Sequence, residues 1–210
     1  LTETRGRHFD PSWSHDGRRI VFNTEQGRAI YVMNADGSGQ SQITNGSYVN
    51  PRQPTWSPDG TKIAFAAIPS GGTNNQIYVI NSSQFDYGTG LQRLSNNSSS
   101  EMYPSWSPDG SKIIFQTNRN GPEPEIYVMN ADGSGQVNLT NNSYGDEHPR
   151  WSADGTQIVF WSNRDGGYEE IYVMNADGSN QTRLTTDGGY QWRAAWSPAP
   201  ATSIPGPDWG

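Results

Sequence analysis

Charged and aromatic side chains gather at one recurring place in this chain, directly before a proline or its counterpart Ala194. In each copy a tryptophan follows this proline or alanine by two residues. When the copies are aligned on these tryptophans, the three residues before the proline or alanine differ in every copy. The candidate ligand-binding residues at these places are His8, Asp10, Arg52, Gln53, Glu101, Tyr103, Asp146, Glu147, His148, Trp192 and Arg193. Gathered around one axis, such groups could bind a peptide, a sugar or a cation. Variation of an exposed loop without any function is the alternative explanation.

The same residues do not form a recognisable catalytic or metal-binding set. His8, Asp10, Glu147 and His148 are of metal-ligand type, but their spacing gives no support for a metal site. The aspartate of each recurring Ser-Pro-Asp-Gly segment is expected to accept backbone N–H bonds rather than to act in acid–base chemistry. The sequence therefore predicts neither an enzyme nor a bound cofactor.

One sequence unit that must position these residues is repeated along the chain. The motif Pro-Ser-Trp-Ser-Pro-Asp-Gly has four close copies and a degenerate fifth, and its tryptophans recur 43 to 50 residues apart. These tryptophans are Trp13, Trp56, Trp106, Trp151 and Trp196. Ile-Tyr-Val-Met-Asn and Leu-Thr, or close variants of them, recur in phase with the first motif. A period of this length is typical of propeller blades.

The unit that begins at Pro104 predicts four short strands. They cover residues 104–107, 112–116, 125–129 and 136–139. Each is rich in β-branched or aromatic residues and is bounded by Gly, Pro, Asn or Asp. Pro-Asp-Gly and Ala-Asp-Gly suit tight turns between antiparallel strands, and no segment has the 3.6-residue apolar period of a helix.

The predicted fold is therefore an all-β propeller of four-stranded antiparallel blades, with four complete blades and the first strand of a fifth at Trp196. The tryptophans of the four complete copies are expected to pack between neighbouring blades. The propeller is expected to cover residues 1–198, and residues 199–210 are interpreted as a proline-rich tail or linker.

Composition restricts the classes of partner. The net charge is −7 and there is no basic run, which argues against nucleic acid or an anionic membrane surface as the main partner. No apolar stretch is long enough to span a membrane. Only 31% of residues are hydrophobic, but eight Trp and ten Tyr supply large contact areas for blade packing.

The recurring motifs resemble a known family. Trp-Ser-Pro-Asp-Gly-x-x-Ile-x-Phe, then Asn-Arg-Asp/Asn-Gly, Ile-Tyr-Val-Met-Asn-Ala-Asp-Gly-Ser and Leu-Thr are similar to the WD40-like repeat of the TolB-like β-propellers, over residues 1 to about 198. The resemblance implies a bacterial propeller outside the cytoplasm, periplasmic or extracellular, that binds protein partners. Similar repeats also precede prolyl-oligopeptidase-like hydrolases.

The two ends of the chain carry complementary parts of a blade. Leu1-Thr2 matches the end of a fourth strand, and Trp196 matches a first strand. The expectation is that about thirty upstream residues would complete a fifth blade. A strained four-bladed ring and chains that complete one another are the alternatives, and open blade edges favour self-association.

Three functions fit these observations. The first is a non-catalytic protein- or peptide-binding scaffold of the bacterial envelope or a secreted one. The second is a carbohydrate-binding, lectin-like propeller in which aromatic rings stack on sugars. The aromatic residues considered for stacking are Tyr48, Tyr144, Tyr168, Tyr190 and Trp192. The third is the regulatory propeller of a hydrolase.

Overall fold

The computed structural model describes residues 7–24, 29–44, 48–82, 90–166 and 168–186. In these residues the chain forms sixteen strands and no helix. No described segment is therefore a helix that could cross a membrane. The strands make four separate sheets of four strands each, and every pairing is antiparallel. The predicted fold class is confirmed.

Each sheet is a blade whose strands pair in the order in which they occur along the chain. Blade 1 consists of β1 (His8–Trp13), β2 (Arg19–Thr24), β3 (Ile30–Asn34) and β4 (Ser41–Gln42). Blade 2 consists of β5 (Tyr48–Trp56), β6 (Lys62–Pro69), β7 (Gln76–Asn81) and β8 (Gln92–Arg93). Blade 3 consists of β9 (Glu101–Trp106), β10 (Lys112–Thr117), β11 (Glu125–Asn130) and β12 (Val137–Asn138). Blade 4 consists of β13 (Asp146–Trp151), β14 (Gln157–Ser162), β15 (Glu170–Asn175) and β16 (Thr182–Arg183).

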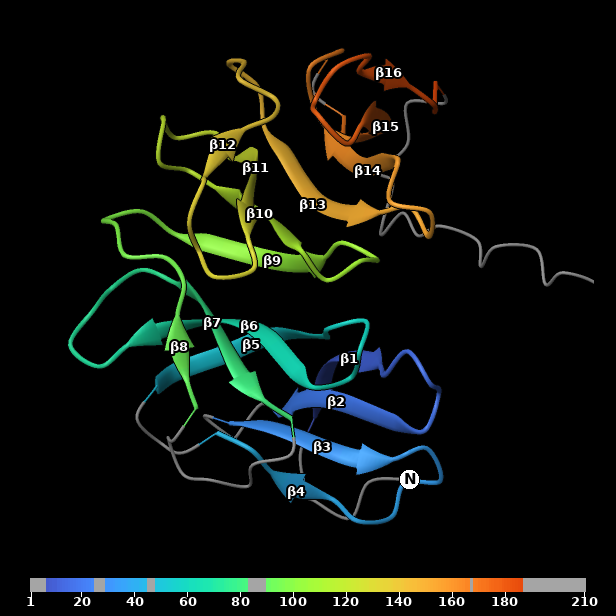
Figure 1. Cartoon of the computed structure of the whole chain (residues 1–210). Coiled ribbons are helices and arrows are strands. Elements are labelled where there is room, and N and C mark those ends of the chain that lie inside the picture. Colours follow the sequence, from blue (N-terminus) through green and yellow to red (C-terminus); the bar gives the residue numbers. More distant parts are fainter. Residues whose placement is uncertain (1–6, 25–28, 45–47, 83–89, 167, 187–210) are drawn as a thin grey trace, which may run out of the picture.

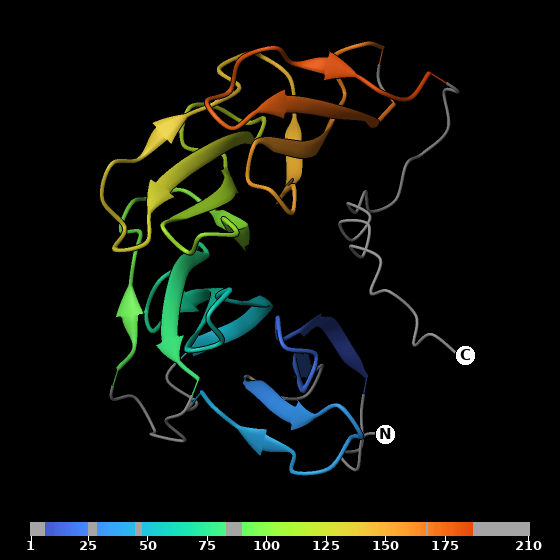
Figure 2. The ribbon, with the colours of Figure 1, turned by 45° about the vertical axis from the view of Figure 1, so that its right-hand side comes forward.

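The blades follow one another around an arc (Figures 1 and 2). The first strands β1, β5, β9 and β13 contact one another in sequence and line a common axial channel. Among the described residues, no strand of blade 1 contacts a strand of blade 4. The described blades therefore form an open arc and not a closed ring of four. The expected fifth first strand at Trp196, the segment Leu1-Thr2 and residues 199–210 lie outside the described residues.

Apolar clusters between neighbouring blades make the core. Trp56 of blade 2 packs with Val21 and Ile30 of blade 1, and Trp106 of blade 3 packs with the buried residues of blade 2. Only 5% of the surface of Trp56 and 7% of that of Trp106 is exposed, and the half-buried Trp151 packs against the cluster between blades 3 and 4. The prediction that these tryptophans lie between blades is confirmed.

The same prediction is wrong for Trp13, which is 58% exposed. Each of the other three tryptophans rests against the blade that precedes its own. No described blade precedes blade 1, so Trp13 has no such face to cover it. The packing of this residue type thus depends on a neighbouring blade and not on its own strand.

The turn between the third and fourth strands also fits against the preceding blade. Gly133 and Gly178 have φ angles of +90° and +88°, and a Cβ atom would lie 2.6 Å and 2.7 Å from the carbonyl oxygens of Leu94 and Leu139. Both the left-handed backbone and the close approach require glycine. The recurring Ala-Asp-Gly sequence therefore serves blade-to-blade contact as well as the turn. Leu184 occupies the corresponding place in blade 4 and is 56% exposed.

The turn between the first and second strands is held by its aspartate. In blade 3, Gly110 has a φ of +71°, and its N–H donates to the carbonyl of Ser107 at 2.9 Å. The Ser107 hydroxyl donates to Asp109 Oδ1 at 2.6 Å, and the backbone N–H of Ser111 donates to the same oxygen at 3.0 Å. This bears out the expected structural role of the turn aspartates.

These bonds give the stability of the protein a defined pH dependence. The hydrogen bond from Ser107, followed by those from Ser111, lowers the pKa of Asp109 from 3.8 to about 2. Because the pKa is lowered in the folded state, the stabilisation is present above pH 4 and is lost as the pH falls toward 2. We expect an NMR titration of the Asp109 carboxyl carbon to give a midpoint near pH 2. Ser107→Ala should raise that midpoint more than Ser111→Ala does, and equal or absent effects would contradict the assigned cause.

Candidate functional site

The residue before the proline has an unusual backbone in each first strand. Asp10, Gln53, Tyr103 and His148 have φ angles of 49°, 54°, 55° and 55°. This left-handed region is uncommon for residues other than glycine, and a following proline favours extended backbone instead. Because four blades share the feature, it belongs to the architecture of the repeat.

A β-bulge accounts for this geometry. The register of the first and second strands shifts at this point in every blade. In blade 3, Met102 pairs with Gln116 and Ser105 pairs with Ile114, so Tyr103 and its proline stand opposite the single residue Phe115. In an unbroken strand, side chains alternate strictly between the two faces of the sheet. The bulge interrupts this alternation and turns the side chain before the proline toward the channel.

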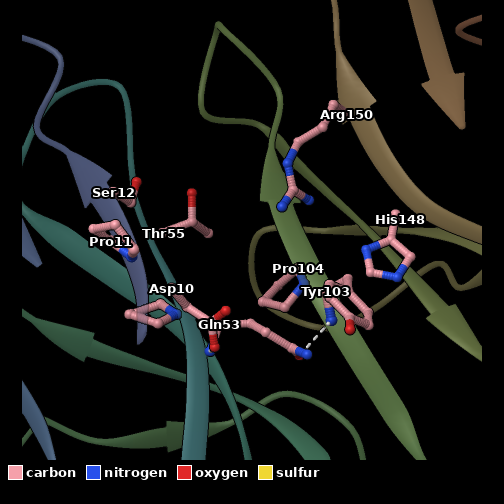
Figure 3. A pocket seen from close by; sticks show the side chains of 10 residues that line it. Asp10, Pro11, Ser12, Gln53, Thr55, Tyr103, Pro104, His148 and Arg150 are labelled. Atoms are coloured by element: carbon pink, nitrogen blue, oxygen red, sulfur yellow. Dashed lines mark hydrogen bonds between the residues drawn. The ribbon is translucent and has the colours of Figure 1, made fainter. Parts of the chain in front are cut away.

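These four side chains surround one cavity at the mouth of the axial channel (Figure 3). The cavity has a volume of about 260 Å³. Among the described residues, its wall is formed by the first strands, namely by Asp10, Pro11, Ser12, Gln53, Pro54, Thr55, Tyr103, Pro104, His148 and Arg150. The turns that carry His15, Pro58, Pro108 and Ala153 border a separate cavity together with the four tryptophans. The residues before the prolines and the turns between the first and second strands therefore lie at different places along the channel.

Hydrogen bonds link three of the four positions around the mouth. The backbone N–H of Gln53 donates to Asp10 Oδ2 at 3.2 Å, and the N–H of Tyr103 donates to Gln53 Oε1 at 3.0 Å. The N–H of His148 donates instead to Gln116 Oε1 on β10, at 3.0 Å. Asp10 and Gln53 thus have a structural task, because each satisfies a backbone group of the next blade.

Three aromatic rings lie together at the side of the mouth that blades 3 and 4 form. The Tyr103 and His148 rings have their centroids 3.7 Å apart, and the Trp161 ring lies 4.3 Å from that of His148. Burial, with smaller contributions from Asp10 and Glu147, raises the pKa of the Tyr103 hydroxyl. The phenol therefore stays protonated at neutral pH and can donate a hydrogen bond to a ligand.

Arg52 and Glu147 lie beside the mouth. Arg52 borders an adjoining cavity of about 330 Å³ that shares Asp10, Gln53 and Tyr103 with the first. Its buried Nε has no hydrogen-bond partner among the described residues. Glu147 Oε2 lies 3.8 Å from His148 Nε2, and burial, followed by the charge of Glu169, raises the pKa of Glu147. His8 is half-buried at the start of β1, with its ring against the edge of Phe22 at 5.3 Å between centroids.

Glu101 and Asp146 do not face the mouth as the sequence interpretation expected. Both are fully buried, and each pairs with an arginine that follows the second strand of its own blade. Arg119 Nη2 contacts Glu101 Oε1, and Arg164 Nη2 lies 2.8 Å from Asp146 Oδ1. Carboxylates held in this way are part of the blade, so we exclude them from the candidate site.

The sequence contained a signal for these ion pairs that was not used. Arg119 and Arg164 both stand in the recurring Asn-Arg-Asn/Asp-Gly segment, eighteen residues after their carboxylates. Asn97 and Asn142 stand four residues before the same carboxylates and donate to them at 2.5 Å and 2.6 Å. A triad that recurs with constant spacing in two repeats indicates structure rather than recognition.

Some of the remaining candidate residues lie outside the part of the chain that the structure describes. Trp192, Arg193 and Tyr190 lie outside the described residues, as does the side chain of Tyr48. Tyr144 and Tyr168 are exposed but do not line the mouth cavity. In the described part of the chain, no three His, Asp or Glu side chains gather closely enough to hold a metal ion.

Sequence reasoning missed a second tier of the channel wall. It consists of the residues that directly follow the proline in each first strand, and these are Ser12, Thr55, Ser105 and Arg150. Three of them are small and hydroxylated, whereas Arg150 is long and charged. The comparison between repeats that identified the residues before the proline would also have shown the difference at this position.

Four antiparallel blades around an axial channel define a β-propeller. Residues 85–204 match the model of the TolB beta propeller domain, so the chain belongs to this family.

Individual relatives agree with this assignment. A TolB homolog of Chlorobium luteolum is 37% identical over 133 residues, which cover 62% of this chain and 28% of that protein. The Tol-Pal system protein TolB of Francisella tularensis subsp. mediasiatica is 34% identical over 83 residues, 39% of this chain and 19% of that protein. The solved structure of a TolB protein from Agrobacterium tumefaciens superimposes with a TM-score of 0.79 at 27% identity, covering 90% of this chain and 65% of the other. The matched part of the chain thus spans 19% to 28% of the length of these curated relatives.

Proposed function

We propose that this chain is a non-catalytic protein- or peptide-binding propeller module that acts in the bacterial periplasm or outside the cell. One observation carries the proposal: four blades present four different side chains, Asp10, Gln53, Tyr103 and His148, on the same strained backbone around one cavity. A repeat that fixes the backbone and varies the side chain produces one asymmetric site.

The character of the mouth also supports a protein partner. Tyr103, His148 and Trp161 form an aromatic group, and Arg52 lies beside them. Aromatic residues and arginine are the side chains most often responsible for binding energy between proteins. The relatives from the Tol-Pal system favour a place in the bacterial envelope.

A carbohydrate-binding module is the second candidate function. Tyr144 and Tyr168 are exposed and could stack on sugar rings. They lie away from the mouth cavity, however, and multivalent lectins would carry equivalent residues in every repeat. The regulatory propeller of a hydrolase is the third candidate. Self-association through the end blades stays a prediction, for which the exposed Trp13 and Leu184 offer apolar contact area.

Tyr103→Ala should weaken binding of a peptide partner by about 30-fold, which corresponds to about 2 kcal/mol for an aromatic hot spot. A displayed peptide library and a pull-down from envelope extract would supply the partner, and a glycan array run in parallel would test the sugar alternative. Isothermal titration of that partner against Tyr103→Ala measures the loss.

Asp109→Asn is the matched control, because Asp109 lies in a turn between the first and second strands and away from the mouth cavity. It should leave the affinity unchanged. If Asp109→Asn weakens binding and Tyr103→Ala does not, the binding face has been assigned to the wrong end of the channel.

A further inference from the structure

Arg150 is the exception within the second tier of the channel wall. The other three blades place Ser12, Thr55 and Ser105 at this position, directly after the proline of the first strand. Short side chains suit a place where four strands converge on an axis. An arginine at the fourth position puts a charged side chain into the space that the short ones leave.

The orientation of Arg150 agrees with this placement. Its Nη1 donates to the carbonyl of Pro149 at 2.9 Å, which ties the guanidinium to its own strand. Figure 3 shows the guanidinium pointing from β13 into the space between Thr55 and Tyr103, and Arg150 lines the mouth cavity together with both residues. Thr55 and Tyr103, which both carry a hydroxyl group, thus belong to the same wall.

Two guanidinium groups beside this cavity offer partners to an anion in spite of the net charge of −7. Arg150 and Asp10 are the oppositely charged groups in its wall, and Asp10 already accepts the backbone N–H of Gln53. Arg52 adds a second guanidinium in the adjoining cavity, and Glu147 adds a second carboxylate 3.8 Å from His148. In a site partly withdrawn from water, a guanidinium and hydroxyl donors together recognise an anionic group.

We propose that Arg150 binds a carboxylate of the peptide that enters the channel mouth, either its C-terminus or an acidic side chain. The proposal rests on the proposed peptide-binding function and names the chemistry of its ligand. A carboxylate matches the planar fork of the guanidinium and carries a single charge. A phosphate dianion would meet stronger repulsion from Asp10, and so it is the less favoured anion.

Small probes test the anion site without any knowledge of the partner. In NMR spectra of the ¹⁵N-labelled chain, N-acetylglycine should cause saturable shifts of the amide signals of Gln53, Thr55 and Tyr103, whereas N-acetylglycinamide should not. N-acetylaspartic acid α-amide, which offers a side-chain carboxylate, distinguishes the two sources of this group. Tighter binding of inorganic phosphate than of either carboxylate would overturn the proposal.

Arg150→Ser supplies the decisive variant, because three other blades carry a small hydroxylated residue at this position and the fold accepts it there. The variant should abolish the shifts caused by N-acetylglycine. Arg18→Ser removes an exposed arginine from the turn of blade 1 and should leave those shifts unchanged. Shifts that survive in Arg150→Ser, or that vanish in Arg18→Ser, would contradict the assignment to Arg150.

Peptides selected by display then connect the site to the proposed function. Neutralising the C-terminus by amidation, or the acidic side chain by substitution with its amide, should weaken binding to the unmodified protein by about 10- to 100-fold, the range for a hydrogen bond to a charged group. For Arg150→Ser, the acid and its neutral form should bind within about twofold of each other, since the group that distinguishes them is gone.

The two proposals can fail separately. Peptides that depend on Tyr103 but bind equally well in acid and neutral forms would overturn the role of Arg150 and leave peptide binding intact. Conversely, if the small carboxylates bind at Arg150 but no peptide depends on Tyr103, the anion site stands and the proposed function fails.

Discussion

Trp106→Ala is expected to lower the free energy of unfolding by about 3–5 kcal/mol, the range for deleting a large buried aromatic side chain. Trp106 is 7% exposed and packs between blades 2 and 3 with Ile77, Leu94 and Phe115. Alanine would leave a cavity that the rigid sheets on either side cannot close. Urea unfolding followed by circular dichroism measures the change.

Trp13→Ala is the matched control for this prediction. The two tryptophans stand at the same position of the repeat, but 58% of the surface of Trp13 is exposed. Its replacement should change the free energy of unfolding by less than about 0.5 kcal/mol. Equal losses in the two variants would mean that the burial of Trp106 between blades does not determine its contribution.

Arg119→Ala should cost a similar amount, about 3–5 kcal/mol, because it leaves a buried carboxylate without its counter-charge. Glu101 is fully buried, and Asn97 and Thr117 are its remaining hydrogen-bond donors. Arg119 also lies over the Tyr127 ring, with its guanidinium carbon 4.5 Å from the ring centroid, so its loss removes packing as well. Chemical unfolding at neutral pH gives the magnitude.

A double-mutant cycle separates the ion pair from general damage. Glu101→Gln combined with Arg119→Ala should be less destabilising than the sum of the two single changes, since Glu101→Gln removes the charge that Arg119→Ala leaves buried. The exposed Arg18→Ala should cost less than about 0.5 kcal/mol. Additive losses for Glu101 and Arg119 would argue that the two residues act independently.

The sequence by itself determined the blades. The phase of the three motifs, the strand-length apolar runs and the Asp-Gly turns predicted the order of strands and the antiparallel hairpins. These features are local: a turn such as Ser107 to Gly110 closes through bonds among residues a few positions apart. Each repeat also tested the interpretation of the others, which is why the fold was predictable from one chain.

Only the tertiary structure decided which side chains meet in the candidate site. The bulge before each proline changes which face the following residues occupy, so neither the inward turn of Tyr103 nor the place of Arg150 in the channel follows from alternation. Glu101 and Tyr103 are two residues apart in sequence, yet one pairs with Arg119 in its own blade and the other meets His148 of the next blade. The exposure of Trp13 likewise depends on a neighbouring blade and not on its own motif. Partners that lie in another blade are a property of the assembled arc, and the local pattern around a residue carries no record of them.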